Sequence, residues 1–557
     1  MATQPSTGVC AAHDRLPAGI ERLGLGLAAD EDGLPRLVFP ETFNVARYAI
    51  DRHVADGRGA RIALRTFARD FSYAELLEQV NRFGNALVSL GAARGDRVLI
   101  VSPDRPEFLF LFWGAIKAGL VPVPLNAQAR APEFEFIIQH SRCAAVVYGP
   151  ELSGEAEKAL SASPWQPPIV LRLDGGGDSL AHRAASASPC LDAAPTRADD
   201  DCYGLYSSGT TGSPKGVVHA HRSIAACCQL FTVGVLGARE DDTFYSVARL
   251  FFSYGLAVIG SGPFWAGATA VLAAERQTPE LVVEVLRRFE PTVLAAVPTF
   301  YAQLLASGLL RREDAPRLRL GLSAAEAMPA ALHRQWSALT GVPILEGLGS
   351  TEVGHIYVAN RPGDIRPGTT GRPVPGYRVR IVDDDGKDVA AGECGRLLVR
   401  GQSVTSGYWN DPDRTARAIV DGWFDTGDSF ACDASGSYVF QGRCDDMFKT
   451  SGRWVSPIEI EAVALQHPKV LEAAVIARTD PHGLLKPELW VVPTDPGEAC
   501  GQLAGEILEF ARSRLPKHKW PAWIRLVDEL PRTASGKIQR YRLRDEPLHA
   551  ADCPSLP

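Results

Sequence analysis

The sequence predicts an α/β protein with a large N-terminal domain of parallel-rich sheets flanked by helices and a small α+β C-terminal domain. In roughly the first four hundred residues, helical and strand-like stretches alternate, which is typical of βαβ units. The pattern changes after Gly442, where a compact αβ segment runs to Arg544. The chain has 557 residues, enough for more than one domain and for large hydrophobic cores.

The alternation begins with a helix over residues 71–91, where apolar residues recur at helical spacing. The elements predicted after it are a strand over 97–102, a helix over 106–118, strands over 144–148 and 292–297, and a helix from Thr299. Strands that are separated by helices in this way favour parallel sheets.

Two segments depart from this pattern. Residues 151–200 are rich in Ala, Ser, Gly and Asp and have weak periodicity, so we expect a variable surface excursion there. Residues 250–274 carry no charged side chain and are long enough to span a bilayer. Their glycines, serines and Pro263 favour a buried helix that ends near Trp265, followed by a strand over 268–273.

Composition excludes several classes of protein. A net charge of −7 does not suggest the extended basic surface that binds nucleic acid. The eleven cysteines include no C-x-x-C pair, which indicates scattered thiols of a reducing compartment. The N-terminus lacks a basic region followed by an apolar core, so we expect no signal peptide and a cytoplasmic location.

Residues 206–221 read YSSGTTGSPKGVVHAH. Hydroxyls and unobstructed backbone N–H groups can wrap polyphosphate oxygens, and Lys215 adds a point charge. It is not a Walker A loop, because Pro214 and Gly216 stand where that loop needs glycine and a metal-binding hydroxyl. Without further motifs, the alternative is a plain surface loop. The candidate ATP-binding residues here are Ser207, Ser208, Gly209, Thr210, Thr211, Gly212 and Lys215.

This string closely resembles the phosphate-binding loop of the adenylate-forming superfamily, which contains acyl-CoA synthetases, non-ribosomal peptide synthetase adenylation domains and firefly luciferases. Five further segments follow in the order that the superfamily uses, so the resemblance covers about residues 41–544. The resemblance also implies a distorted β-barrel in the large domain. It implies an N-terminal domain over 1–441, a hinge over 442–446 and a C-terminal lid domain over 447–557.

Residues 347–352, GLGSTE, match the acidic motif of the superfamily. The resemblance implies that Glu352 holds Mg²⁺ on the triphosphate and that Thr351 touches the α-phosphate. Many relatives have tyrosine at the position of Leu348, which offers apolar contact to adenine without stacking. The other residues implied to bind ATP in the large domain are Ser323, Ala324, Glu346 and Gly347.

Residues 423–428, WFDTGD, end on Asp428, which corresponds to the aspartate that grips the ribose hydroxyls. Arg443 corresponds to a ribose-contacting arginine and Asp445 to the hinge. The segment KTSG would face the incoming thiol, which makes its residues the CoA-site candidates: Lys449, Ser451 and Gly452.

The last motif, PRTASGK over 531–537, ends on Lys537. It corresponds to the lysine that delivers charge during adenylation, a role that suits a compact point charge. Without the resemblance, Lys537 would be one more exposed residue of a basic tail. Thr351, Glu352 and Lys537 are therefore the implied catalytic residues, and the implied cofactors and cosubstrates are ATP, Mg²⁺ and CoA.

The acid-binding segments, RLFFSYGL over 249–256 and STEVGHIY over 350–357, resemble those of the benzoate- and hydroxybenzoate-CoA ligase branch. There they line a pocket for a flat aromatic acid. The alternative for the phenylalanines and for His355 is ordinary core packing. Alanine at 325, where relatives have glycine, narrows the pocket, and Gly354, where relatives have a bulky residue, widens it. The candidate acid-binding residues are Ser253, Tyr254, Gly255, Ala325, Gly349 and His355.

The expected function is therefore MgATP-dependent adenylation of an aromatic acid, followed by transfer to CoA with release of AMP. Benzoate, hydroxybenzoates, aminobenzoates and cyclohexane carboxylate all stay open as the acid. The alternative is a stand-alone enzyme that loads a separate carrier protein. We expect no carrier domain after Arg544, which favours the release of free aryl-CoA. We expect a monomer or homodimer that binds a small acid and CoA and contacts neither membrane nor nucleic acid.

Overall fold

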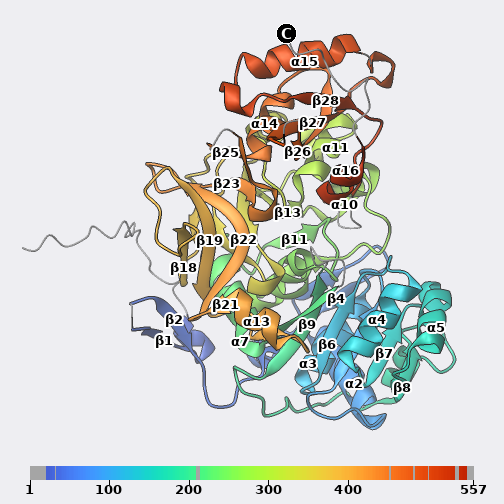
Figure 1. Ribbon diagram of the computed structural model, residues 1–557. Helices are drawn as coiled ribbons and strands as arrows, with labels where there is room; N and C mark the ends of the chain where they lie inside the picture. The colour runs from blue at the N-terminus through green and yellow to red at the C-terminus, as the bar shows by residue number, and fades with distance from the viewer. Residues whose placement is uncertain are drawn as a thin grey trace, which may run out of the picture. The chain divides into compact units, whose positions relative to one another are not determined.

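The computed structural model describes residues 20–31, 33–207, 214–450, 453–480, 483–499, 501–532 and 538–547 (Figure 1). The chain divides into two compact units. The first contains Met1–Val379 and Val399–Phe424, and the second contains Arg380–Leu398 and Asp425–Pro557. Both units mix helices and sheets, so the predicted α/β class is confirmed.

The first unit contains a parallel four-stranded sheet in the order β6-β5-β7-β8, with helices packed around it (Figure 1). Its strands are β5 (Arg97–Val101), β6 (Val121–Leu125), β7 (Ala145–Tyr148) and β8 (Ile169–Arg172). Its helices are α2 (Tyr73–Ser89), α3 (Pro106–Lys117), α4 (Ala131–Ser141), α5 (Ser153–Ala162) and α6 (Leu180–Ser186). Ser72 caps the N-terminus of helix α2 and forms a capping box with Glu75.

The expectation of an irregular excursion over 151–200 is wrong. This segment contains α5, β8 and α6, and β8 adds a parallel edge strand to the sheet. Strand β8 is short, and only Ile169 and Leu171 are buried in it, while Val170 and Arg172 are exposed. So few apolar residues give a weak sequence signal even though they are enough for one edge strand.

The first unit also contains a nine-stranded sheet, in the order β17-β16-β15-β14-β13-β11-β12-β3-β4. Its central strands are parallel, and β16, β17 and β4 are antiparallel at the two edges. The strands are β3 (Ile62–Arg65), β4 (Asp70–Ser72), β11 (Thr243–Ser246), β12 (Thr269–Val271), β13 (Val293–Ala296), β14 (Leu320–Ser323), β15 (Ile344–Gly349), β16 (Ile356–Ala359) and β17 (Arg372–Pro373).

Helices α10 (Pro279–Phe289), α11 (Pro298–Ala306) and α12 (Ala330–Thr340) pack on this sheet. Tyr301 and Trp336 meet edge to face in the core between them, with ring centroids 4.8 Å apart. The strands of this sheet that end at Ser323 and Gly349 carry the predicted nucleotide motifs, so the rigid core fixes where those motifs lie.

The uncharged stretch 250–274 folds as helical turns inside the first unit. It contains α8 (Ser253–Gly255), the π-helical segment η5 (Leu256–Ser261), α9 (Gly262–Ala266) and strand β12. The predicted buried helix and following strand are thus confirmed. No helix in the described part of the chain is long and apolar enough to cross a membrane.

A small three-stranded sheet carries the residues on either side of the phosphate loop. Its order is β20-β10-β9, with β9 (Asp201–Ser207), β10 (Lys215–Ala220) and β20 (Gly407–Tyr408). A Cβ on Gly204 would lie 2.0 Å from the ring of Trp409, so glycine is needed there to let the indole pack on the sheet.

The remaining elements of this unit are peripheral or connect the sheets. They are η1 (Ile20–Leu23), β1 (Gly26–Ala29), β2 (Pro35–Val38), η2 (Arg47–Asp51), α1 (Arg52–Ala55), η3 (Pro150–Leu152), α7 (His221–Ala226), η4 (Cys227–Val233), η6 (Arg312–Asp314), η7 (Thr351–Val353), α13 (Pro412–Ala418) and β21 (Ile419–Val420). The boundaries between the two units fall within β18 (Tyr377–Val382), β19 (Cys394–Gly401) and, between Phe424 and Asp425, β22 (Trp423–Cys432). These strands form a curled sheet with β21 and β23 (Tyr438–Arg443), in agreement with the expected distorted barrel.

The second unit is built around the sheet β26-β27-β28, whose first pair is antiparallel and whose second pair is parallel. A core that includes Ile460, Val475, Leu489 and Ile507 joins this sheet to helices α14 and α15. Its elements are η8 (Cys444–Asp446), β24 (Phe448–Thr450), β25 (Arg453–Val455), α14 (Pro457–Ala464), β26 (Val470–Thr479), β27 (Leu485–Pro493), η9 (Pro496–Glu498), α15 (Gly501–Arg512), η10 (Lys517–Lys519), β28 (Trp523–Leu526) and α16 (Arg540–Asp545).

Candidate active site

Lys215 and Glu352 form an ion pair at the centre of the candidate nucleotide site. Lys215 begins strand β10, and Glu352 lies in the short 3₁₀ helix η7. Tyr408 donates its phenolic proton to the same Glu352 oxygen across 3.0 Å. Burial opposes ionisation of Glu352, but Lys215 and these hydrogen bonds outweigh it and hold the pKa of the carboxyl below its ordinary value. The buried group is therefore a carboxylate, able to hold a cation.

Backbone contacts fix the turn that carries Thr351 and Glu352. Ser350 caps η7 by accepting a hydrogen bond from the Val353 N–H, with Oγ and N 3.3 Å apart. His219 donates from Nε2 to the Thr351 carbonyl across 2.7 Å. Burial lowers the pKa of His219 to about 4, so its ring stays neutral. The predicted pair Thr351 and Glu352 thus lies on a rigid turn beside Lys215.

Ser207 lies opposite Lys215 in the β9–β10 ladder. Its Oγ is buried and makes no hydrogen bond with any residue that the structure describes. A buried hydroxyl without a partner costs free energy unless a ligand or neighbouring group satisfies it. This hydroxyl at the start of the phosphate loop therefore fits an anion-binding role.

The predicted adenine segments meet at the ends of two neighbouring strands. Ser323 on β14 lies directly opposite Glu346 on β15. Burial raises the pKa of Glu346 to about 8, and its carboxyl accepts a hydrogen bond from the Met328 N–H with O and N 3.2 Å apart. Ala324 is buried beside them. The parallel register thus brings these motifs together although more than twenty positions separate them in the sequence.

Ala325 has a positive φ of +75°. This is the left-handed region, where a Cβ is unfavourable and glycine is preferred. An alanine is therefore held in an unfavourable backbone conformation at this candidate site.

Strand β15 also carries Gly347, Leu348 and Gly349 toward the acidic turn. A Cβ on Gly347 would lie 2.7 Å from Ile356, and a Cβ on Gly349 would lie 2.8 Å from the His355 carbonyl. Gly349 therefore allows the backbones of β15 and β16 to approach closely, and Gly347 leaves room for the Ile356 side chain.

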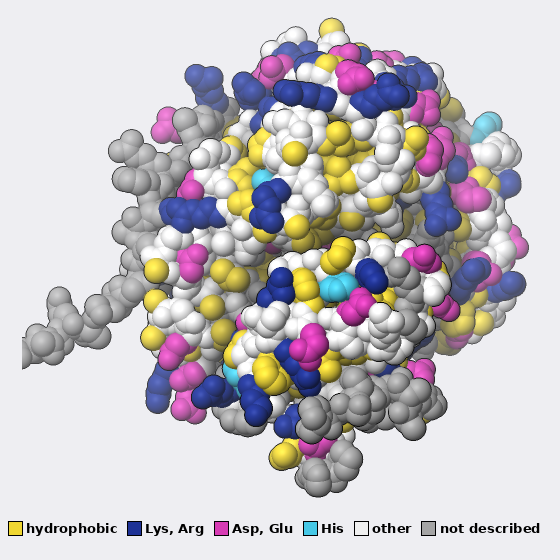
Figure 2. Space-filling model, turned by 90° about the horizontal axis from the view of Figure 1, so that it is seen from above, with side chains coloured by type: hydrophobic (Ala, Val, Ile, Leu, Met, Phe, Trp, Pro, Cys, Tyr) yellow, Lys and Arg dark blue, Asp and Glu magenta, His cyan; other side chains and the backbone are white. Residues whose placement is uncertain are grey.

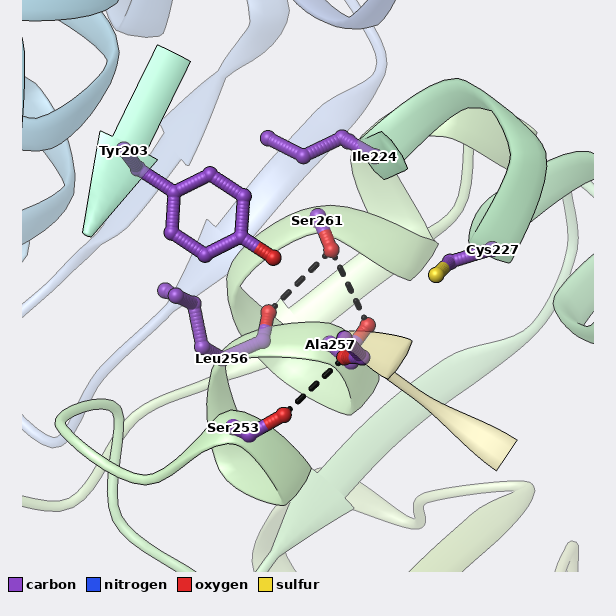
Figure 3. A pocket seen from close by; sticks show the side chains of 8 residues that line it. Tyr203, Ile224, Cys227, Ser253, Leu256, Ala257 and Ser261 are labelled. Carbon is purple, nitrogen blue, oxygen red and sulfur yellow. Dashed lines mark hydrogen bonds between the residues drawn. The ribbon is translucent and has the colours of Figure 1, made fainter. Parts of the chain in front are cut away.

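A narrow cavity lies in the first unit next to the acidic turn (Figure 3). It is lined by Tyr203, Ile224, Cys227, Ser253, Leu256, Ala257, Ser261 and Gly354. Ser253 donates from Oγ to the Gly354 carbonyl across 3.0 Å, which ties the α8 turn to the end of η7. Of the predicted residues, Ser253 lines this cavity, as does Gly354.

Three other predicted acid-site residues lie around this cavity without lining it. Tyr254 donates its hydroxyl proton to the Leu322 carbonyl across 2.9 Å. Gly255 packs so closely that a Cβ would lie 2.1 Å from the Arg249 carbonyl oxygen. His355 is buried against Phe231, with ring centroids 4.8 Å apart, and burial lowers its pKa to about 3. These contacts are thus with Leu322, Arg249 and Phe231, which do not line the cavity.

Sequence reasoning missed six lining residues: Tyr203, Ile224, Cys227, Leu256, Ala257 and Ser261. One available signal was the position of Tyr203 on the strand that leads into the phosphate loop. The alternation of a strand places Tyr203 on the same face as Ser207.

The second unit brings Asp428 and Arg443 together. They lie opposite each other on β22 and β23, and Arg443 donates from Nη1 to Asp428 Oδ1 across 2.7 Å. The same nitrogen donates to the Thr426 carbonyl across 2.9 Å. Asp445 and Lys449 are exposed nearby in the sequence, on η8 and β24.

Several predicted residues lie outside the described residues: Ser208, Gly209, Thr210, Thr211, Gly212, Ser451, Gly452 and Lys537. The positions that flank the Lys537 segment are described. Arg532 and Ile538 form an isolated antiparallel bridge, and Arg532 also forms an ion pair with Glu472 across 2.9 Å. The base of this segment is thus anchored to the core sheet of the second unit.

Residues 51–409 match the model of the AMP-binding enzyme family, and residues 459–537 match that of the AMP-binding enzyme C-terminal domain. The chain belongs to the AMP-binding enzyme family. This AMP-binding enzyme is 42% identical over 526 residues to the benzoate–CoA ligase of Thauera aromatica, covering 93% of this chain and 99% of the relative. It is 43% identical over 511 residues to the 4-hydroxybenzoate–CoA/benzoate–CoA ligase of Rhodopseudomonas palustris, covering 91% and 94%.

Solved structures agree with this assignment. A benzoate CoA ligase from Burkholderia xenovorans superposes with a TM-score of 0.84 at 37% identity, covering 90% of this AMP-binding enzyme and all of that chain. An anthranilate CoA ligase in complex with anthranoyl-AMP gives a TM-score of 0.86 at 37% identity, covering 91% and 98%. The likeness spans both units, which confirms the predicted superfamily and its ligase branch.

Proposed function

We propose that this protein joins a benzoate-type aromatic acid to CoA in the cavity beside the Thr351–Glu352 turn. It is an AMP-forming acid–thiol ligase that uses ATP, Mg²⁺ and CoA. The acid and ATP first give an aryl-adenylate and pyrophosphate, and the CoA thiol then displaces AMP. The observation that carries the proposal is the cavity, which shares Gly354 with the end of the turn that bears Glu352.

Adenylation brings a carboxylate up to a polyanion, so the site must neutralise negative charge. In the proposal, Lys215 and the phosphate-loop hydroxyls bind the phosphates, and Thr351 contacts the α-phosphate. Glu352 fits Mg²⁺, because this ion is held in proteins by one or two carboxylates together with substrate phosphates. Bound there, Mg²⁺ would supply charge neutralisation on the triphosphate.

The residues of the second unit take complementary roles in the proposal. Asp428 accepts hydrogen bonds from the ribose hydroxyls, and Arg443 holds the carboxylate in position by donating a hydrogen bond to it. Lys537 supplies positive charge during adenylation. The lid then reorients about Asp445 in the hinge 442–446, which brings the segment Lys449–Gly452 to the thiol. The domains in this proposal are 1–441 and 447–557.

The finer statements about partners and location are also proposals. A net charge of −7 and the mixture of acidic and basic side chains in Figure 2 favour small-molecule substrates over nucleic acid. The cysteines Cys143, Cys202, Cys227 and Cys228 are buried free thiols, which fits a reducing cytoplasm. We expect a monomer or a homodimer.

The test is mass spectrometry of the products that purified protein forms from MgATP, CoA and a mixture of small carboxylic acids. The expected result is one dominant aryl-CoA with an equal amount of AMP. An aryl-adenylate without any CoA thioester would contradict the proposal and indicate an enzyme that loads a carrier protein.

A further inference from the structure

The hydroxyl of Tyr203 points into the acid cavity (Figure 3). Its ring stacks on the neutral His219, with centroids 4.9 Å apart and planes at 15°. This stacking, together with burial on β9, fixes the direction of the phenol. The hydroxyl makes no hydrogen bond with any residue in the described part of the chain.

Two serine hydroxyls in the same cavity already donate hydrogen bonds to backbone carbonyls. Ser253 donates to the Gly354 carbonyl across 3.0 Å. Ser261 donates to the carbonyls of Leu256 and Ala257, each 3.2 Å away. A hydroxyl has one proton and two lone pairs, so both serines face the cavity as acceptors.

Burial raises the pKa of Tyr203 far above its ordinary value, so this phenol stays neutral and keeps its proton. The cavity therefore presents one free donor and two acceptors among apolar walls formed by Ile224, Leu256 and Ala257. An unsubstituted ring would leave the Tyr203 hydroxyl without a partner and the free lone pairs of the two serines unused, and an unpaired buried polar group costs free energy.

We infer that Tyr203 is a specificity-determining residue that selects a ring hydroxyl, so that hydroxybenzoates are preferred over benzoate. A ring hydroxyl can accept a hydrogen bond from the Tyr203 hydroxyl and donate one to Ser253 or Ser261. An aromatic amine matches less well, because it offers two donors and only a weak acceptor for the Tyr203 proton. This inference rests on the proposed function of the cavity as the acid site.

The experiment compares kcat/KM for benzoate, for 2-, 3- and 4-hydroxybenzoate and for 2-aminobenzoate in the wild type and in Tyr203→Phe. In Tyr203→Phe we expect kcat/KM to fall about tenfold for at least one hydroxybenzoate and to change less than twofold for benzoate. The reason is that a site built to hydrogen-bond a hydroxyl discriminates strongly against acids that lack it. Ser261→Ala removes an acceptor and should shift the same ratio in the same direction. Tyr148→Phe, on the buried strand β7 away from the cavity, is the matched control.

Equal changes for benzoate and all three hydroxybenzoates in both cavity variants would overturn the inference while the ligase activity stands. A loss confined to the aminobenzoate would also overturn it. If the wild type forms no aryl-CoA from any of these acids, the proposed function itself fails. Comparing kcat/KM among the acids thus distinguishes a failure of the inference about Tyr203 from a failure of the proposed function.

Discussion

A Cβ built on Gly354 lies 3.3 Å from the Tyr203 hydroxyl, so the missing side chain of Gly354 leaves open the space in front of this phenol. Gly354 ends the acidic turn in the left-handed conformation, with φ of +81°. Gly354 therefore ends the turn that carries Glu352. In the proposed acid site it would also set how near a ring substituent can come to Tyr203.

Gly354→Ala should change which ring substituents are accepted. The added methyl occupies the space beside the Tyr203 hydroxyl and His219, so kcat/KM should fall more for hydroxybenzoates than for benzoate. The positive φ should also lower the free energy of unfolding by roughly 1 kcal/mol. Gly363→Ala is the control, since that glycine has φ of +86° and no atom within 4 Å of a built Cβ. Unaltered preferences across the panel would remove Gly354 from the acid site.

Ala325→Gly should stabilise the protein by about 1 kcal/mol, because it relieves an alanine held at positive φ. The neighbouring Ala324→Gly is the matched control. Ala324 is buried and has no positive φ, so the loss of its methyl should destabilise the protein. Urea unfolding of both variants measures the difference. Equal destabilisation by both changes would show that the backbone at 325 is not strained.

Glu346 should make stability depend on pH. Its pKa is raised in the folded state to about 8, so its contribution to stability is fully present below the unfolded value and is lost as pH rises through about 8. The free energy of unfolding of the wild type should therefore fall between pH 5 and pH 9. Glu346→Gln, which mimics the protonated form, should lack this component of the slope. Identical slopes would mean that Glu346 is ionised when folded.

Glu352→Gln should lower the rate of adenylation by roughly a hundredfold or more, the scale of losing a preorganised charged group. Acid-dependent pyrophosphate exchange measures this step alone. Glu313→Gln, an exposed carboxylate on η6, is the control and should keep full activity. Exchange at the wild-type rate in Glu352→Gln would contradict the role proposed for this carboxylate.

Lys537→Ala should cripple adenylation and spare thioester formation from a supplied aryl-adenylate. The reason is that its positive charge is needed only when the carboxylate approaches the α-phosphate. Single-turnover measurement of each half-reaction checks this. Equal loss in both half-reactions would be inconsistent with a lid that serves two states.

The sequence alone predicted the larger elements closely, because long periodic segments carry a strong signal. The helix expected over 71–91 is observed at Tyr73–Ser89, and the strand expected over 97–102 at Arg97–Val101. The short edge strand β8 escaped because few of its residues are buried.

The candidate site was predictable where it consists of contiguous motifs, and less so where it is assembled from distant strands. The sequence contained both Lys215 and Glu352, but their ion pair exists because β10 and η7 meet in the fold. The donors and acceptors of the cavity could not be counted from sequence, since Ser253 and Ser261 become acceptors only through their contacts with backbone carbonyls.

In the ion pair between Lys215 and Glu352, each side chain neutralises the charge of the other. An anion that draws Lys215 away leaves a buried carboxylate without its cation, and a cation that takes Glu352 leaves the ammonium group without its anion. A ligand that brings both charges at once satisfies both residues. In the proposed nucleotide site, this pairing would favour the metal-bound nucleotide over inorganic anions, free nucleotide or free metal.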